Sequence, residues 1–272
     1  MDYFSASLYG VVQGLTEFLP ISSSGHLALI PQFLDITDPG VAFDLTMHVG
    51  TAMAVIVYFR TELQKLIRDT LWFFLKRPEK LSPRYYLPLY MLGSTVTTLV
   101  LVLCLKGFVE KLGARTPQII AFNLAFFGLL MAWADLKKKK SPQKAEWMIQ
   151  QKQWKKALMI GLFQGLAIFP GVSRSGATLT ISRFLGLERN EASRYSFLLS
   201  LPIILGGFIL KLPDLFQEGS TVSLGACLWG TSISFVVGLL SIHLFLKLVQ
   251  NLGLGLYAIY RVILAGIILA VL

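Results

Sequence analysis

Long uninterrupted runs of apolar residues dominate the chain and predict membrane-spanning helices. Six of them approach or exceed the roughly 20 residues that a helix needs to cross a bilayer. They are 41–59, 86–105, 117–135, 195–212, 222–246 and 254–272. The runs are continuous rather than alternating, which favours helices over the strands of a membrane β-barrel. The pattern therefore predicts an all-α polytopic membrane protein with about six transmembrane helices.

Two shorter apolar stretches break off at polar turns and predict re-entrant helical hairpins. Residues 5–19 end at Pro20 and the turn "ISSSGH", and a second apolar piece, 27–34, follows. Residues 157–169 end in the same way at Pro170 and the turn "VSRSGAT". Irregular backbone at membrane depth is tolerated only where protein or water covers it. Each stretch is therefore interpreted as a hairpin whose polar tip lies inside the protein.

The two hairpins are similar to each other at a fixed spacing of 151 residues. Residues 13–25 and 164–176 share seven identities in thirteen ungapped positions. The spacing predicts two repeats, about 1–135 and about 152–272, joined by a basic linker at 136–151 within a single membrane domain. Because each repeat holds three crossings, the second copy is expected upside down relative to the first. Inverted repeats with broken helices mark a binding site at their interface.

The distribution of charge predicts an orientation in the membrane. Only 15% of the 272 residues are charged, against about 25% in an ordinary soluble domain. The net charge of +10 would also suit nucleic acid. However, most Lys and Arg fall in three connections on one side of the six-span arrangement: 60–84, 136–156 and 182–194. Such positive loops are typically cytoplasmic. We therefore expect cytoplasmic loops there, both termini outside, and no nucleic-acid partner.

The two turns carry the candidate chemistry. Gln13 and Glu17 are four residues apart, so a helix places them on one face. Arg174 lies in the second turn, and its guanidinium can bind a phosphate through two parallel hydrogen bonds. Intramembrane Glu and Arg are functional candidates by default. Serines in such turns are more often structural, and Gln13 is explained equally well by hydrogen bonding between helices.

Together these groups predict a phosphate site. Hydroxyl side chains accompany the arginine: Ser173, Ser175 and Thr178. Glu17 is a poor neighbour for phosphate unless a cation lies between them. We therefore expect Mg²⁺ or Ca²⁺, held by Glu17 and by Gln13. His26 is a candidate general acid or base. Four further polar groups are interpreted structurally: Asp44 and His48 as satisfied groups, and His243 and Arg261 as groups near cytoplasmic helix ends that snorkel or pair.

The turn segments resemble the two signature motifs of a known family. "QGLTEFLPISSSGH" and "PGVSRSGAT" are similar to those of the undecaprenyl-diphosphate phosphatases, the bacitracin-resistance protein family. The resemblance covers essentially the whole chain, including "FDLTMHVGT" and "YAIYR". It implies hydrolysis of undecaprenyl diphosphate to the monophosphate and orthophosphate, which recycles the lipid carrier for peptidoglycan. It also implies bacitracin resistance, a bacterial plasma-membrane location, a divalent cation and a site open to the extracytoplasmic side.

The resemblance also implies roles for individual residues. Glu17 matches the second acidic residue of the first motif, Ser23 the proposed nucleophile and His26 the motif histidine. The phosphate-binding motif is matched by Ser173, Arg174 and Thr178. Gln13 stands where some members carry a second glutamate, so metal binding is assigned mainly to Glu17. Whether Ser23 attacks directly or orients a water stays open at this point.

A transporter is the main alternative. Inverted repeats with re-entrant hairpins are typical of secondary carriers, and Glu17 and His26 could relay protons. A flippase for polyprenyl phosphate is the version closest to these residues. A non-catalytic scaffold is disfavoured, because Glu17 and Arg174 are costly at membrane depth. The expected partners are a polyprenyl diphosphate and membrane lipid, and the sequence leaves a homodimer open.

Overall fold

The structure is a computed structural model that describes residues 2–34, 38–76, 82–112, 116–137, 153–211, 213 and 223–272. Within these ranges the chain is helical and contains no strand, which confirms the predicted all-α class. The α-helices are α1 (Tyr3–Thr16), α2 (Ser23–Leu34), α3 (Val41–Tyr58), α4 (Arg60–Lys76), α5 (Tyr86–Lys111), α6 (Pro117–Leu136), α8 (Trp154–Gly165), α9 (Arg174–Phe184), α10 (Arg189–Lys211), α11 (Leu224–Leu252) and α12 (Gly255–Val271). Two short 3₁₀ helices, η1 (Pro83–Tyr85) and η2 (Leu166–Ile168), complete the list.

Each of the six predicted spans corresponds to one apolar helix. Among the described residues, α5, α6, α10 and α11 are long and apolar enough to cross a membrane, and α3 and α12 are shorter apolar helices. The fold is therefore that of an all-α polytopic membrane protein. Helix α10 begins at Arg189, before the apolar span predicted from residue 195, and the Arg189 side chain binds the carboxylate of Asp135, at 2.8 Å from Nη2 to Oδ2.

Two of the expected loops are in large part helical, so the sequence prediction is wrong there. Residues Arg60–Lys76 form α4, which follows α3 after a single residue. Leu63 and Leu66 lie three apart on α4 and pack against the core, while Lys65 is exposed. Because charged residues lie next to these leucines, the helical spacing of the apolar residues was not recognised in the sequence. In the connection 182–194, only residues 185–188 lie between α9 and α10. The linker 136–151 falls almost wholly outside the described residues.

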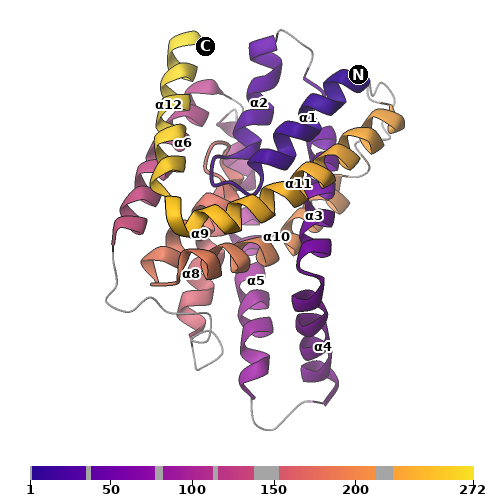
Figure 1. Ribbon diagram of the computed structural model, residues 1–272, viewed down its shortest axis with the longest axis vertical. Helices are drawn as coiled ribbons and strands as arrows, with labels where there is room; N and C mark the ends of the chain where they lie inside the picture. The colour runs from indigo at the N-terminus through magenta and orange to yellow at the C-terminus, as the bar shows by residue number, and fades with distance from the viewer. Residues whose placement is uncertain are drawn as a thin grey trace.

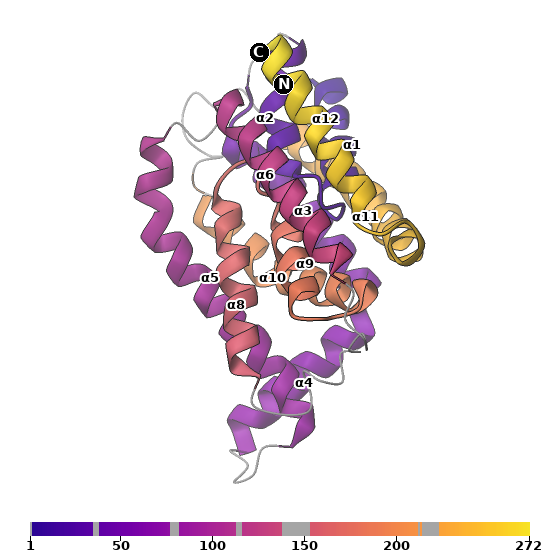
Figure 2. The ribbon, with the colours of Figure 1, turned by 90° about the vertical axis from the view of Figure 1, so that its left-hand side faces the viewer.

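The helices form an elongated molecule with both termini at one end (Figures 1 and 2). Helix α4 and the start of α5 lie at the opposite end. Helix α1 packs along α11 and α8 along α5, while α6 pairs with α12 and α3 with α10. If the helices of the two predicted repeats are matched in chain order, α1 corresponds to α8 and α5 to α11. The contact of α1 with α11 is then the counterpart of the contact of α8 with α5. The boundaries and inversion of the two repeats remain predictions.

Close helix contacts depend on glycine where α8 packs on α5 and where α3 packs on α11. A Cβ on Gly161 of α8 would lie 2.3 Å from the carbonyl oxygen of Ser94 on α5. A Cβ on Gly50 of α3 would lie 2.3 Å from the carbonyl oxygen of Thr231 on α11. Small residues let membrane helices approach closely, which favours dispersion contacts that lipid would otherwise provide. The absence of a side chain at these two glycines thus allows the paired helices to lie this close together.

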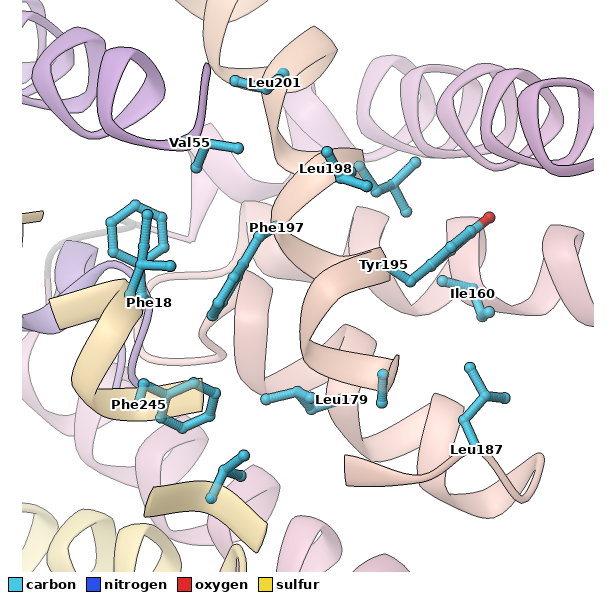
Figure 3. Packing of buried hydrophobic residues seen from close by; sticks show 14 of the residues in the cluster. Phe18, Val55, Ile160, Leu179, Leu187, Tyr195, Phe197, Leu198, Leu201 and Phe245 are labelled. Carbon is cyan, nitrogen blue, oxygen red and sulfur yellow. The ribbon is translucent and has the colours of Figure 1, made fainter. Parts of the chain in front are cut away.

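The largest buried apolar cluster includes Phe18, which lies just before the first turn in the chain (Figure 3). The ring of Phe18 meets that of Phe197 edge to face, with centroids 5.1 Å apart, and Phe197 contacts Phe245 at 5.8 Å. Phe18 is fully buried and follows Glu17 in the chain. Packing of this aromatic ring therefore fixes the backbone that carries the Glu17 carboxylate.

Candidate functional site

The two polar turns share the same unusual backbone. Ser22 and Ser173 have φ angles of 75° and 69°, and among the described residues no other non-glycine has a positive φ. The hydroxyl oxygen of each serine accepts the N–H of the glycine three residues later, Gly25 at 3.3 Å and Gly176 at 3.0 Å. A non-glycine residue in this region costs about 1–3 kcal/mol and is frequent at functional sites. The equivalent residues of the two hairpins thus hold the same strained turn.

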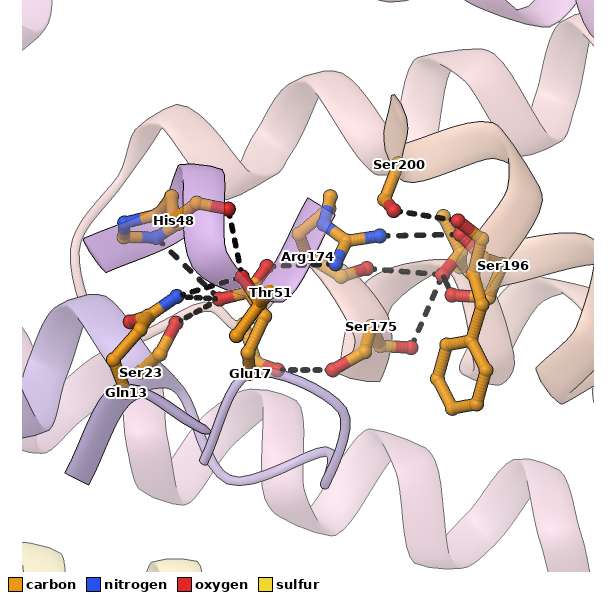
Figure 4. A network of polar contacts seen from close by, with 12 residues as sticks. Gln13, Glu17, Ser23, His48, Thr51, Arg174, Ser175, Ser196 and Ser200 are labelled. Atoms are coloured by element: carbon orange, nitrogen blue, oxygen red, sulfur yellow. Dashed lines mark hydrogen bonds and ion pairs between the residues drawn. The ribbon is translucent and has the colours of Figure 1, made fainter. Parts of the chain in front are cut away.

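The tips of the two hairpins meet through a buried ion pair (Figure 4). Arg174 Nη2 lies 2.8 Å from Glu17 Oε1, and the two side chains are only 11% and 4% exposed. Arg174 Nη1 donates to the Ser196 carbonyl on α10 at 3.1 Å. The Ser175 hydroxyl donates to the Leu19 carbonyl at 3.2 Å. The structure therefore brings the predicted carboxylate and guanidinium together in the interior.

Glu17 is the centre of the polar network. Its Oε2 atom accepts a hydrogen bond from Ser23 Oγ at 2.6 Å and one from Gln13 Nε2 at 3.0 Å. His48 Nε2 lies 3.4 Å from the same oxygen. Gln13 Nε2 also lies 3.4 Å from Thr51 Oγ1. Gln13, Glu17 and Ser23 of the first motif therefore converge on one carboxylate oxygen.

The predicted phosphate-binding hydroxyls lie around Arg174 but are engaged with protein. Ser173 caps α9, and its Oγ is 3.2 Å from Ser175 Oγ. The Thr178 hydroxyl contacts the Arg174 carbonyl at 3.0 Å and Ser196 Oγ at 2.5 Å. All three hydroxyl residues are buried. They hold the turn in shape, while Arg174 and the first N–H groups of α9 are the donors suited to an anion.

His26 is directed away from the ion pair. Its Nδ1 lies 2.7 Å from the Ser22 carbonyl oxygen and its Nε2 lies 2.7 Å from Tyr260 Oη. The imidazole stacks on the Tyr260 ring with 7° between the planes. Because Ser23 donates to Glu17, the base adjacent to this serine is the carboxylate. The structure does not bring His26 to Ser23 as a base would require.

Arg261 occupies the interior, so of the two expected outcomes it pairs with backbone carbonyls and does not snorkel. The residue is 0% exposed. Its guanidinium donates to five carbonyl oxygens: Pro20 in the first turn, Gly171 and Val172 in the second, and Asn123 and Leu124 on α6. These bonds tie both turns to one side chain. His243 pairs as expected, because its Nδ1 lies 3.4 Å from the hydroxyl oxygen of Tyr58.

Three polar side chains at the site are not anticipated from the sequence. His48 and Thr51 come from α3, and Ser196 comes from α10. Each of these helices follows one hairpin directly, and His48 and Thr51 are three residues apart on one helix face. Each of the three polar residues lies inside an otherwise apolar span that follows one of the two hairpins. This pattern is the sequence signal that could have identified them.

The first-turn residues fit a hard divalent cation. Gln13 is 0% exposed, and its Oε1 has no hydrogen-bond partner among the described residues. Rotation of the amide by 180° exchanges Oε1 with Nε2, which now lies 3.0 Å from Glu17 Oε2. Carboxylate and amide oxygens suit Mg²⁺ and Ca²⁺. The described residues contain no group of three His, Cys, Asp or Glu side chains placed to hold a metal ion. A cation here would therefore need oxygens from a ligand.

Comparison with known proteins gives a consistent picture. Residues 6–267 match the family described as "Bacitracin resistance protein BacA". The chain is 40% identical over 272 residues to a protein of Marinobacter nauticus named "Undecaprenyl-diphosphatase", with all of both chains covered. It is 41% identical over 270 residues to "Undecaprenyl-diphosphatase 2" of Stutzerimonas stutzeri, covering 99% of this chain and 98% of that protein.

Proposed function

Because the chain belongs to the bacitracin resistance protein BacA family, we propose that it hydrolyses undecaprenyl diphosphate to undecaprenyl phosphate and orthophosphate. Full-length similarity to proteins named undecaprenyl-diphosphatase supports this substrate. The observation that carries the proposal is the buried Glu17–Arg174 pair, with Ser23 on the same carboxylate. A diphosphate attached to a lipid explains why this chemistry lies inside a membrane protein. The product would re-enter the carrier cycle of peptidoglycan synthesis, and its supply would confer bacitracin resistance.

Arg174 binds the substrate phosphate in this account. Its guanidinium offers two parallel N–H donors to phosphate oxygens and offsets the charge that develops as the anhydride bond breaks. The Ser196 carbonyl holds the other side of the guanidinium at 3.1 Å, so its orientation is fixed before substrate arrives. Phosphoryl transfer depends chiefly on such positioning and charge stabilisation.

Glu17 activates the nucleophile. Ser23 Oγ is 2.6 Å from Glu17 Oε2, so the carboxylate can accept its proton as Oγ attacks the terminal phosphorus. A new O–P bond then forms while the anhydride P–O bond breaks and undecaprenyl phosphate leaves. Water next releases orthophosphate from the serine. If water attacks directly, Glu17 accepts the proton of that water and Ser23 orients it.

Glu17 and Gln13 would hold a divalent cation, Mg²⁺ or Ca²⁺. When bound, such a cation neutralises charge on the diphosphate beside a carboxylate that would otherwise repel it. Gln13 Oε1, for which the described ranges offer no hydrogen-bond partner, supports this assignment. We expect a chelator to abolish phosphate release and added Mg²⁺ or Ca²⁺ to restore it.

In this account the enzyme lies in a bacterial plasma membrane, with its site open to the extracytoplasmic side. The position of both termini at one end, with α4 at the other, supports this orientation (Figure 1). After replacement of Cys104 and Cys227, a single cysteine at Lys76 should resist an impermeant thiol reagent in intact cells, and one at Asp2 should react. The reverse labelling would contradict the orientation.

Release of orthophosphate distinguishes hydrolysis from transport. The purified protein should release orthophosphate from undecaprenyl diphosphate in detergent, where no second compartment exists. A protein that only flips lipid phosphates would release none under these conditions, whatever its activity in vesicles.

A further inference from the structure

His48 faces the same carboxylate oxygen as the nucleophile candidate. Its Nε2 lies 3.4 Å from Glu17 Oε2, and its side chain is 17% exposed. Helix α3 fixes this position, because Thr51 Oγ1 donates to the His48 carbonyl at 2.8 Å and lies 3.4 Å from Gln13 Nε2. The imidazole therefore belongs to the first-turn network, although it comes from a different element.

The other ring nitrogen determines which proton His48 carries. Nδ1 lies 2.8 Å from the backbone carbonyl oxygen of Asp44. A carbonyl oxygen only accepts hydrogen bonds, so Nδ1 must be the donor and carries a proton. In the neutral ring Nε2 then presents a lone pair. This lone pair faces Glu17 Oε2, which is itself an acceptor.

Two facing acceptors require a positive species between them. A carboxylate oxygen and an imidazole lone pair at 3.4 Å repel each other unless a cation or a proton intervenes. The arrangement matches ordinary metal-site construction, in which a ligating histidine donates its second N–H to a backbone carbonyl. Gln13 Oε1, which has no hydrogen-bond partner within the described part of the chain, is a third acceptor once rotation of the amide exchanges it with Nε2.

We propose that His48 Nε2 is a ligand of the divalent cation, beside Glu17 and Gln13, and so supplies the donor that a second carboxylate would otherwise provide. An imidazole nitrogen suits first-row transition metals, whereas Ca²⁺ takes oxygen ligands. His48 therefore biases the site toward Mn²⁺ or Co²⁺ over Ca²⁺. This inference rests on the proposed function only for the role of the cation in hydrolysis. Metal binding itself can be measured without lipid substrate.

Mn²⁺ binding to the purified full-length protein tests this assignment. The wild type with Mn²⁺ should show electron-spin-echo modulation from an imidazole ¹⁴N. His48→Gln should lose that modulation and bind Mn²⁺ at least about tenfold more weakly, while its Ca²⁺ affinity changes less than threefold. His243→Gln is the matched control, because His243 contacts Tyr58 rather than Glu17. It should retain both the modulation and the affinity.

Two outcomes would overturn the assignment. One is a wild-type Mn²⁺ spectrum without nitrogen modulation, which needs no variant to fold and would leave His48 as an imidazolium paired with Glu17. The other is a folded His48→Gln protein that binds Mn²⁺ within threefold of the wild type. Because no lipid is present, either result is independent of whether the protein hydrolyses undecaprenyl diphosphate.

Discussion

Arg174 Nη2 and Glu17 Oε1 lie 2.8 Å apart although 157 positions separate the two residues in the sequence. The contact joins the tips of both hairpins in the interior of the protein. A buried charge is costly without a partner, so each residue explains the presence of the other. The same contact places the phosphate donor beside the candidate base.

Removal of Arg174 should abolish catalysis, and a lysine should not fully replace it. Loss of one preorganised charge-stabilising group typically costs about 10²–10³ in kcat, roughly 3–4 kcal/mol. Arg174→Lys keeps the charge but loses the planar fork, so we expect it to be impaired less than Arg174→Ala. Steady-state kinetics with undecaprenyl or farnesyl diphosphate measure both effects.

A double variant separates the phosphate role of Arg174 from its structural role. Arg174→Ala leaves Glu17 buried without its guanidinium and should lower the melting temperature. Adding Glu17→Gln removes the uncompensated charge and should restore much of the stability without restoring phosphate release. Recovery of turnover together with stability would show that Arg174 only ties the hairpins together.

Ser23 and His26 should differ sharply in their importance for the reaction. Ser23→Ala removes the hydroxyl bound to Glu17, and we expect a loss of about 10²-fold or more in kcat. His26 is hydrogen-bonded to Ser22 and Tyr260, so His26→Gln should stay within about tenfold of wild type, below the roughly 10²–10⁴-fold that general acid–base catalysis contributes. Equal losses in the two variants would place His26 in proton transfer.

Gly161→Ala should destabilise the bundle without acting on the chemistry. The added Cβ would lie 2.3 Å from the Ser94 carbonyl oxygen, so α8 and α5 must move apart. Overpacking of this kind costs about 1–3 kcal/mol. Gly266→Ala on α12 is the control, since nothing lies within 4 Å of its Cβ, and it should keep the wild-type melting temperature. Similar melting temperatures for the two variants would contradict the close contact.

The apolar runs predicted the spans well because lipid imposes one simple requirement, a continuous apolar helix. Helix α4 was missed because Lys65 and its charged neighbours obscured the spacing of Leu63 and Leu66. The similarity of the hairpins predicted that Glu17 and Arg174 belong to one site. His48 carried a signal in the sequence, a polar residue inside an apolar span that follows the first hairpin, whereas Arg261 could not be placed, because its contacts reach both turns from the last helix. Such contacts depend on packing angles that the local pattern does not encode.

The central claim is that Glu17, paired with Arg174 across the two hairpins, drives hydrolysis of a lipid diphosphate. The most direct test is orthophosphate release from undecaprenyl diphosphate by the purified wild type and by Glu17→Gln, in the same detergent with added Mg²⁺. We expect multiple turnovers by the wild type and a loss of about 10²-fold or more in the variant, measured at a temperature at which both proteins are folded. Release of orthophosphate by a folded Glu17→Gln protein at the wild-type rate, or no release by the wild type, would contradict the account.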